Sequence, residues 1–464
     1  MGIASDLFYT PNGEKETLYR RVVPSEEQID YLQENWNNLA GFLTKSISQL
    51  LVLECKTWIQ GSYKFGTLIR PVSKGLEYDV DLGLYLTPKN NQQLSSIPEP
   101  KKYRSFIQNL LIMYANDDDE IEKVASPPKE KCERIHFKKN FHIDTPAYKL
   151  IDSQHMLAVL PNEWENSDPR EQYLWFKQVC GNVRDAGQLR RIIQYFKNWS
   201  AQKFSGLDKD HQPSSIMLTV LIAEAYVKIN HRMTGADDDV FRLIISEVLA
   251  RIGSSNIVFN PVERSENLNR LSDQGFQNFI NELKMLRDIS DAACSTNSRF
   301  AASLFWEKVF GHFFPIDAES YRNESLPARI APEIEVDISE TSNGKPFMKG
   351  VKNSLSNIPK NCWLNFRITN PYSMPVGCSV KWVVRNRGEE AKNTNDLGHC
   401  SRGKGKFEQQ ERTAYRGTHF MDCSVFDSFG NFYSFRRVPV SIINKTKKEI
   451  WQPAQKNYRS YGNR

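Results

Sequence analysis

A chain of 464 residues, 40% apolar and 25% charged, is long enough for two or three domains and has the composition of a globular protein, which excludes a disordered or fibrous class. No apolar run approaches the ~20 residues of a membrane span and no signal-peptide pattern opens the chain, so the sequence predicts a cytoplasmic protein without a membrane span. The net charge of +6 is concentrated in the last twenty residues, and the near-neutral remainder gives no strong sign of duplex nucleic-acid binding. The eight cysteines have no CxxC spacing, which predicts free thiols and signals no zinc site.

After a mostly helical start over residues 1–57, two acids stand close together in an alternating stretch. Between Glu77 and Leu86 apolar residues occupy every second position, which predicts a half-buried strand with Asp79 and Asp81 on its other face. Carboxylates this close repel each other, and a divalent cation held between them would remove that cost. The alternative interpretation is a solvated strand face that carries two acids.

A Gly-Ser turn lies upstream of these acids. The short strand 58–60 ends at Gln60, and Gly61-Ser62 then opens a helical start. Such a turn offers backbone N–H groups and a hydroxyl to a phosphate. A phosphate-binding turn beside two carboxylates is typical of phosphoryl-transfer sites.

Further polar candidates follow in chain order. Residues 133–150 predict a hairpin that carries Asp144, a third carboxylate on a neighbouring strand, although an acid before Thr-Pro is often only a turn residue. The amphipathic pattern over 188–204 predicts a helix with Lys197, which in isolation fits a surface lysine. Ser214 and Ser215 begin the next helix, which is apolar nearly all round. A lysine and a helix-start serine suit a triphosphate.

The C-terminal third changes in character. Residues 321–360 are rich in Pro, Ser, Asn and Glu and predict a linker between domains. Short alternating segments over 361–445 predict a small all-β sandwich. Residues 446–464 predict a basic flexible tail.

These residues together resemble a known family. Gln60-Gly61-Ser62, Glu77-Tyr78-Asp79-Val80-Asp81, His142-Ile143-Asp144, the Lys197 helix and Pro213-Ser214-Ser215 are similar to the active-site signature of the CD-NTases, bacterial relatives of cyclic GMP-AMP synthase and oligoadenylate synthase in the polymerase-beta superfamily. The resemblance covers roughly residues 1–320. The segment from Trp382 to Cys423 resembles the AGS-C domain, a proposed nucleotide sensor.

The resemblance implies an α+β fold: a polymerase-beta-like palm sheet over about 50–150, a helical lobe over about 170–320, and the sandwich after them. It implies that Asp79, Asp81 and Asp144 hold two magnesium or manganese ions and catalyse nucleotidyl transfer. The nucleotide-binding residues implied are Gln60, Gly61, Ser62, Lys197, Ser214 and Ser215. In the sandwich, Arg402, Arg412 and His419 either bind a sensor ligand or are ordinary surface and inter-strand residues.

Nucleoside triphosphates are the implied substrates, and the implied product is a cyclic oligonucleotide second messenger of anti-phage defence, sensed by a downstream effector protein. One alternative is a linear, possibly deoxyadenylate, oligonucleotide, perhaps primed on a tail hydroxyl of Tyr458, Ser460 or Tyr461. An alternative of another class is a catalytically inactive nucleotide sensor, against which the presence of all three aspartates argues.

Overall fold

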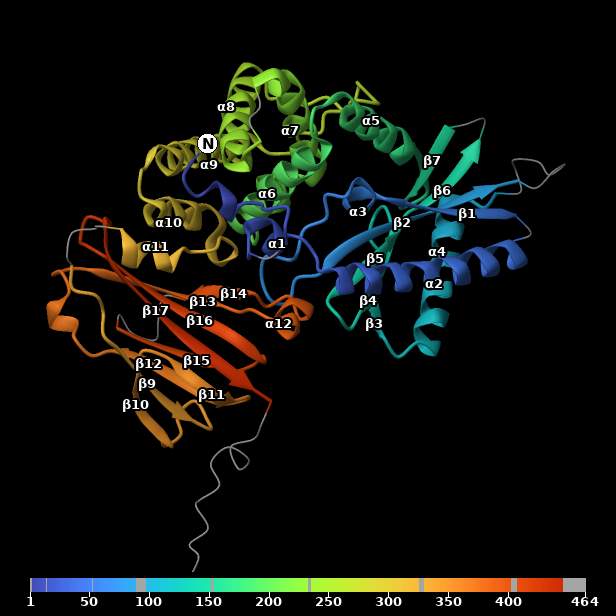
Figure 1. The fold of residues 1–464 in the computed structure, drawn as a ribbon. Coiled ribbons are helices and arrows are strands. Elements are labelled where there is room, and N and C mark those ends of the chain that lie inside the picture. The colour runs from blue at the N-terminus through green and yellow to red at the C-terminus, as the bar shows by residue number, and fades with distance from the viewer. Residues whose placement is uncertain are drawn as a thin grey trace, which may run out of the picture. The chain divides into compact units, whose positions relative to one another are not determined.

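The alternating stretch around Asp79 and Asp81 is strand β2 (Tyr78–Thr87), which lies inside an eight-stranded sheet (Figure 1). This computed structural model describes residues 2–13, 15–51, 53–88, 97–151, 154–232, 235–324, 329–401 and 407–444. The chain divides into two units, Met1–Ile316 and Asp317–Arg464, and the sheet with β2 belongs to the first.

The first sheet runs in the order β3-β4-β5-β2-β6-β7-β8, and β1 pairs with β2. Its remaining strands are β1 (Glu54–Gln60), β3 (Ile121–Val124), β4 (Glu133–Phe137), β5 (Phe141–Thr145), β6 (Ala147–Ile151), β7 (Gln154–Val159) and β8 (Glu163–Asn166). Strand β2 pairs in parallel with β5 along its first half and with β6 along its second. Pro146, which has no N–H group for a strand ladder, separates β5 from β6.

Helices cover the apolar face of this sheet. Val80, Leu82 and Leu84 of β2 are fully buried in one cluster with Leu39 and Ile107, which come from two helices. These helices are α2 (Glu26–Leu50) and α4 (Pro100–Asp117). Because side chains alternate along a strand, the polar residues of β2 lie on the opposite face.

The helical part of the first unit surrounds α6. Its helices are α1 (Leu18–Val22), α3 (Gly61–Phe65), α5 (Pro169–Asn182), α6 (Ala186–Phe204), α7 (Ser215–Ile229), α8 (Asp237–Ser254), α9 (Asp273–Ser295) and α10 (Arg299–Phe310). Tyr195 of α6 packs against Phe8 and Phe310, with ring centroids 5.5 and 6.3 Å away. Aromatic packing and a buried ion pair between Arg191 and Asp237 hold α6 and α8 together.

The second unit contains two sheets, in the orders β10-β9-β12-β15 and β11-β17-β16-β13-β14. Its elements are α11 (Ala318–Asn323), β9 (Ile334–Ser339), β10 (Met348–Lys352), β11 (Leu355–Pro359), β12 (Trp363–Ile368), β13 (Ser379–Arg385), α12 (Glu389–Asn393), β14 (Gly398–Ser401), β15 (Glu408–Arg412), β16 (Gly417–Phe426) and β17 (Phe432–Ile443). Val336 and Phe366 of one sheet share a buried core with Trp382 and Met421 of the other, as in a sandwich.

The predicted α+β class, with a sheet, a helical part and an all-β C-terminal unit, is confirmed. The predicted linker over 321–360 is wrong, because β9, β10 and β11 lie within it. Strand β9 pairs with β12 and with β10, and β11 pairs with β17, so β9 and β11 receive from distant partners the backbone hydrogen bonds that the polar local sequence does not indicate. In the described part of the chain no helix combines the length and apolar character needed to cross a bilayer.

Candidate active site

The end of β1 and the glycine turn after it lie directly against Asp81. Gln60, the last residue of β1, pairs with Asp81 across the antiparallel ladder. Gly61 then adopts φ +61°, a conformation that side chains disfavour, and a Cβ at this position would lie only 2.1 Å from Asp81 Oδ2. A glycine is therefore required for the carboxylate to lie against this backbone.

The register of the sheet brings the third aspartate beside the first two. Strands β2 and β5 pair in parallel, with Asp79 opposite His142 and Asp81 opposite Asp144. Burial, together with the charges of Asp79 and Asp144, raises the pKa of Asp81 well above its usual range. A cation placed among these carboxylates would stabilise their charged forms.

Two basic residues already approach Asp144. Arg134 lies opposite Asp144 in the β4–β5 ladder, and its Nη2 donates to Asp144 Oδ2 at 2.8 Å. Lys129 Nζ lies 3.4 Å from the same oxygen. Burial acts to raise the pKa of Asp144, but Arg134 and Lys129 outweigh it and hold that pKa below its usual range. Arg134 also reaches to 3.9 Å from Asp79 Oδ1.

Ligand atoms suited to a metal converge here. In the described chain, Asp79, His142 and Asp144 bring one such atom each within 4.8 Å of one another, so two of the three predicted aspartates and a histidine form the group. Asp81 lies against the Gly61 backbone instead. Carboxylate oxygens suit magnesium and manganese, and an imidazole nitrogen favours manganese over magnesium.

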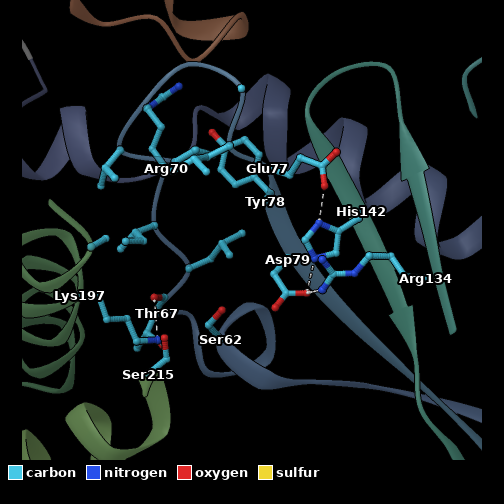
Figure 2. A pocket seen from close by; sticks show the side chains of 17 residues that line it. Ser62, Thr67, Arg70, Glu77, Tyr78, Asp79, Arg134, His142, Lys197 and Ser215 are labelled. Carbon is cyan, nitrogen blue, oxygen red and sulfur yellow. Dashed lines mark hydrogen bonds and ion pairs between the residues drawn. The ribbon is translucent and has the colours of Figure 1, made fainter. Parts of the chain in front are cut away.

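A pocket of about 450 Å³ opens beside these residues (Figure 2). It is lined by Ser62, Thr67, Leu68, Ile69, Arg70, Pro71, Val72, Gly75, Leu76, Glu77, Tyr78, Asp79, Arg134, His142, Lys197, Ala201 and Ser215. In Figure 2, Asp79, His142 and Arg134 lie together on the strands, and Lys197 and Ser215 come from helices across the pocket. The lining therefore combines acidic, basic and hydroxyl groups with the segment from Leu68 to Val72, which is apolar apart from Arg70.

Lys197 is buried rather than exposed on the helix surface. Its Nζ donates to Thr67 Oγ1 at 3.0 Å and to the Thr67 carbonyl oxygen at 3.3 Å. Burial lowers the pKa of Lys197 to about 7, although the charge of Asp81 opposes this. The Thr67 N–H in turn donates to the Ser62 carbonyl oxygen, so the lysine is joined to the Gly-Ser turn.

Two of the predicted nucleotide-binding side chains have structural partners. The Gln60 amide donates to Tyr85 Oη at 2.7 Å and accepts from Tyr148 Oη at 3.2 Å. Ser214 caps α7 by accepting from the Met217 N–H at 3.3 Å. Both side chains are thus engaged in holding the local fold, whereas Ser62, Lys197 and Ser215 line the pocket.

The predicted sensor residues do not form one group. Arg412 belongs to β15 and donates to Asn361 Oδ1 at 2.9 Å, whereas His419 belongs to β16 of the other sheet. His419 accepts from the Arg387 N–H and lies 2.8 Å from the Tyr415 carbonyl oxygen. Both ring nitrogens of His419 therefore have backbone partners. Arg402 and the tail residues Tyr458, Ser460 and Tyr461 lie outside the described residues.

Sequence reasoning missed Arg134, Lys129 and the role of His142. The signal that was available is the hairpin register: once residues 138–140 form the turn, position 134 faces 144 and position 136 faces 142. Charged side chains opposite one another in an antiparallel pair interact. Lys129 precedes β4, and its position depends on loop geometry that the sequence does not specify.

Comparisons with known proteins match two regions of the chain. Residues 55–148 match the nucleotidyltransferase domain of DncV-like cyclic GMP-AMP synthases, and residues 307–443 match the adenylyl/guanylyl and SMODS C-terminal sensor domain, AGS-C. A cyclic GMP-AMP synthase of Escherichia albertii is 28% identical over 459 residues, which cover 97% of this chain and 99% of the relative. One from Vibrio cholerae serotype O1 is 24% identical over 202 residues, 32% of this chain and 43% of that one.

Solved structures show the same fold. The crystal structure of the Vibrio cholerae cyclic AMP-GMP synthase DncV aligns with a TM-score of 0.55 and 18% identity, over 69% of this chain and 98% of that one. Its complex with GTP and 5MTHFGLU2 aligns with a TM-score of 0.56 and 19% identity, with the same coverage. The family matches and the full-length relative together show that the chain is a CD-NTase, a nucleotidyltransferase with a DncV-like catalytic domain and a C-terminal AGS-C domain.

Proposed function

We propose that this chain joins nucleoside triphosphates into a cyclic oligonucleotide, a second messenger that serves anti-phage defence in the bacterial cytoplasm through a downstream effector protein. The observation that carries the proposal is the strand register that sets Asp81 beside Asp144 and Asp79 at the pocket. The names of the relatives support a cyclic product: the Escherichia albertii protein is a cyclic GMP-AMP synthase, and one Vibrio cholerae structure contains the linear intermediate pppA(3′,5′)pG.

The carboxylates fit a divalent metal, because Asp81 faces Asp144 across the β2–β5 ladder, and burial together with the charges of Asp79 and Asp144 raises the pKa of Asp81. Asp79, Asp81 and Asp144 would hold two magnesium or manganese ions, which when bound neutralise triphosphate charge and activate the attacking hydroxyl. The ligand atoms of Asp79 and Asp144, which lie within 4.8 Å of each other, support the same assignment.

The chain's own residues account for binding and for the proton. Lys197 and Ser62 line the pocket and hold the triphosphate, with the backbone at Gly61 beside them. Asp144 takes the proton of the attacking hydroxyl as the hydroxyl oxygen forms its bond to the α-phosphorus. The bond from that phosphorus to the bridging oxygen breaks, and pyrophosphate leaves. A second transfer within the linear product closes the ring.

Arg134 balances part of the charge of the carboxylates. Its guanidinium donates to Asp144 and approaches Asp79, so it supplies positive charge where a cation would bind. Metal binding would therefore compete with this ion pair, and Arg134 would then be available to a phosphate in the same pocket.

The deciding experiment incubates the full chain with all four ribonucleotides and all four deoxynucleotides, with magnesium or manganese, and analyses products by mass spectrometry. We expect a ribonucleotide product that phosphatase does not degrade and that has the mass of a ring. The control is the Asp79→Asn, Asp81→Asn double variant, and an unchanged product from it would contradict the metal-site assignment.

The same experiment separates the alternatives. A product that retains a 5′ triphosphate identifies a linear oligonucleotide, and an increase in the intact mass of the protein identifies self-priming. If none of the nucleotide mixtures yields pyrophosphate, the result favours a nucleotide sensor without catalysis.

A further inference from the structure

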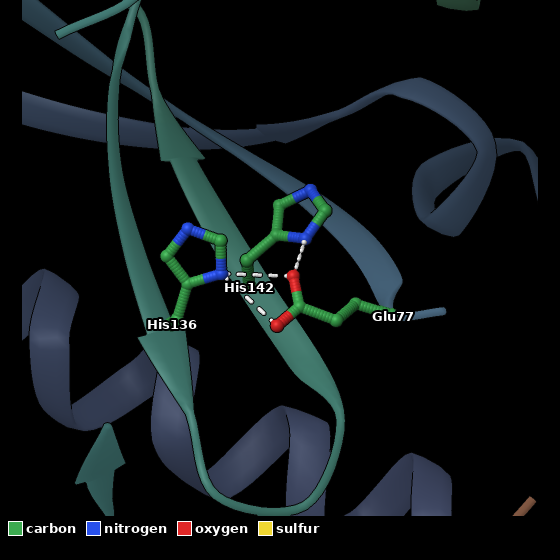
Figure 3. Close-up of side chains that lie close together, drawn as sticks. All are labelled: Glu77, His136 and His142. Carbon is green, nitrogen blue, oxygen red and sulfur yellow. Dashed lines mark hydrogen bonds and ion pairs between the residues drawn. The ribbon is translucent and has the colours of Figure 1, made fainter. Parts of the chain in front are cut away.

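A second group of metal-binding side chains lies next to the carboxylates, and it contains two histidines. Glu77 directly precedes β2, His136 belongs to β4 and His142 to β5 (Figure 3). The antiparallel register places His136 directly opposite His142. The side chains are only 15%, 8% and 21% exposed for His136, His142 and Glu77, so the group is largely shielded from water.

Both imidazole rings direct the same nitrogen toward one carboxylate. His136 Nδ1 lies 2.9 Å and His142 Nδ1 2.7 Å from Glu77 Oε2. Two imidazole nitrogens beside one carboxylate are the donor set of a two-histidine, one-carboxylate metal site.

The other nitrogen of His142 has the partner that a metal-bound histidine needs. His142 Nε2 lies 2.9 Å from Asp79 Oδ1. Because a carboxylate only accepts, Asp79 accepts from the Nε2–H group of His142, and a cation bound beside Glu77 would take the place of the hydrogen through which Nδ1 donates to that carboxylate. A carboxylate that fixes the tautomer of a ligating histidine in this way is a regular feature of metal centres.

We propose that Glu77, His136 and His142 bind a transition-metal dication such as Zn²⁺ or Mn²⁺, at a site distinct from the aspartates that would hold the nucleotide's metal ions. A tetrahedral centre with bonds near 2.05 Å has ligand atoms about 3.3 Å apart. The present nitrogen-to-carboxylate separations of 2.7–3.0 Å need to open by only a few tenths of an ångström, and all three ligand atoms lie within 4.8 Å of one another.

The geometry separates this site from the neighbouring one. His142 contributes Nδ1 here, whereas its Nε2 faces Asp79. Nitrogen donors select zinc and manganese over magnesium, which prefers oxygen. Since Glu77 and His142 line the pocket, a metal held here would lie at its wall and fix the orientation of Asp79 through the histidine. The proposal does not depend on which product the enzyme makes.

The test titrates chelator-treated full-length protein with CoCl₂ in excess MgCl₂ and follows the visible absorption of nitrogen-ligated cobalt. We expect about one equivalent to bind to wild type and at least tenfold weaker binding to His136→Gln, because His136 ligates the proposed metal without contacting any of the three aspartates. His136→Asp, which retains a ligand atom, should recover part of the loss. Asp81→Asn should bind cobalt like wild type.

The matched control is His211→Gln, which removes a histidine that pairs only locally with Asp210 in the first unit. The melting temperature of each variant in EDTA shows whether it is folded, and Glu77→Gln replaces His136→Gln if that variant is not. Cobalt binding by His136→Gln or Glu77→Gln equal to that of wild type, or absence of binding to wild type under these conditions, would overturn the proposal.

Discussion

Asp81 and Asp422 are both strand residues with nearby charges, but their surroundings differ in sign. Asp422 of β16 is 1% exposed and accepts from Arg385 Nε at 2.7 Å and from Arg437 Nε at 2.6 Å. Burial acts to raise the pKa of Asp422, but the two guanidinium groups outweigh it and lower that pKa. Around Asp81 the nearest charges include two more carboxylates, and its pKa is raised.

The comparison shows how a structural carboxylate differs from one that needs a ligand. The second unit supplies two permanent cations to a single acid, so this group requires nothing from solution. The first unit gathers three acids against Arg134 and Lys129, both of which direct their charge to Asp144. Asp81 is therefore the acid whose counter-charge is expected to come from the metal ions that accompany the nucleotide.

The largest effect should follow from removing the Asp81 charge. We expect Asp81→Asn to lower nucleotidyl transfer by about 10³-fold or more, equivalent to about 4 kcal/mol of transition-state stabilisation. Pyrophosphate release measures this directly. Asp288→Asn, on the surface of α9 beside Arg287, is the matched control and should retain full activity. Activity in Asp81→Asn within tenfold of wild type would remove Asp81 from the mechanism.

The second effect concerns stability. Asp422→Asn leaves two buried guanidinium groups facing a neutral amide, and we expect it to lower the free energy of unfolding of the second unit by about 3–5 kcal/mol. Because the pKa of Asp422 is lowered by folding, this contribution is present above the unfolded-state pKa of about 4 and is lost as pH falls through the folded-state value. Chemical denaturation at pH 7 and in acid checks both statements, with exposed Glu408→Gln as control.

Replacing Asp81 by asparagine should change stability in the opposite direction and raise the free energy of unfolding. Folding raises the pKa of Asp81, so the folded state is destabilised as pH rises from about 4 through the raised value, and Asp81→Asn removes that cost. In EDTA at neutral pH we expect a higher melting temperature, by about 2–4 °C for each kcal/mol regained. The gain should vanish in acid. Differential scanning fluorimetry would contradict the comparison if Asp81→Asn melted below wild type in EDTA.

The smallest effect concerns Lys197. With a pKa of about 7 when no nucleotide is bound, this lysine is mostly neutral at pH 8, and a bound triphosphate would raise its pKa. Nucleotide binding at pH 8 should then take up a proton. The affinity for the nucleotide should fall by at most about tenfold for each pH unit above 7. Calorimetry in buffers of different ionisation enthalpy measures the uptake. Lys197→Arg should abolish it, and Lys203→Arg, on the same helix, should not.

Local patterns sufficed for much of the fold. The alternation in β2 was enough to place Asp79 and Asp81 on one face, because a single period decides which side chains are buried with α2 and α4. The helices α6 and α7 followed from their apolar periodicity. Periodicity alone could not predict that Lys197 is buried, because its partner Thr67 lies in a loop that is distant in the sequence.

Cross-strand partners account for the rest. Arg134 and His136 acquire their neighbours only through the hairpin register, and a polar segment such as 348–352 becomes strand β10 only because β9 pairs with it. The periodicity of one segment contains no information about such a partner. The role of His419 also depends on such partners. Backbone groups hold both of its ring nitrogens, and the sequence does not indicate this.

The turn at Gly61 has a consequence for engineering. Since a single methyl group at this position would collide with Asp81 Oδ2, the enzyme can be silenced by adding atoms rather than by deleting a functional group. A Gly61→Ala protein would retain every carboxylate and the lysine of the pocket. Such a protein would displace Asp81 while keeping its charge in the site, which charge-removing variants cannot do.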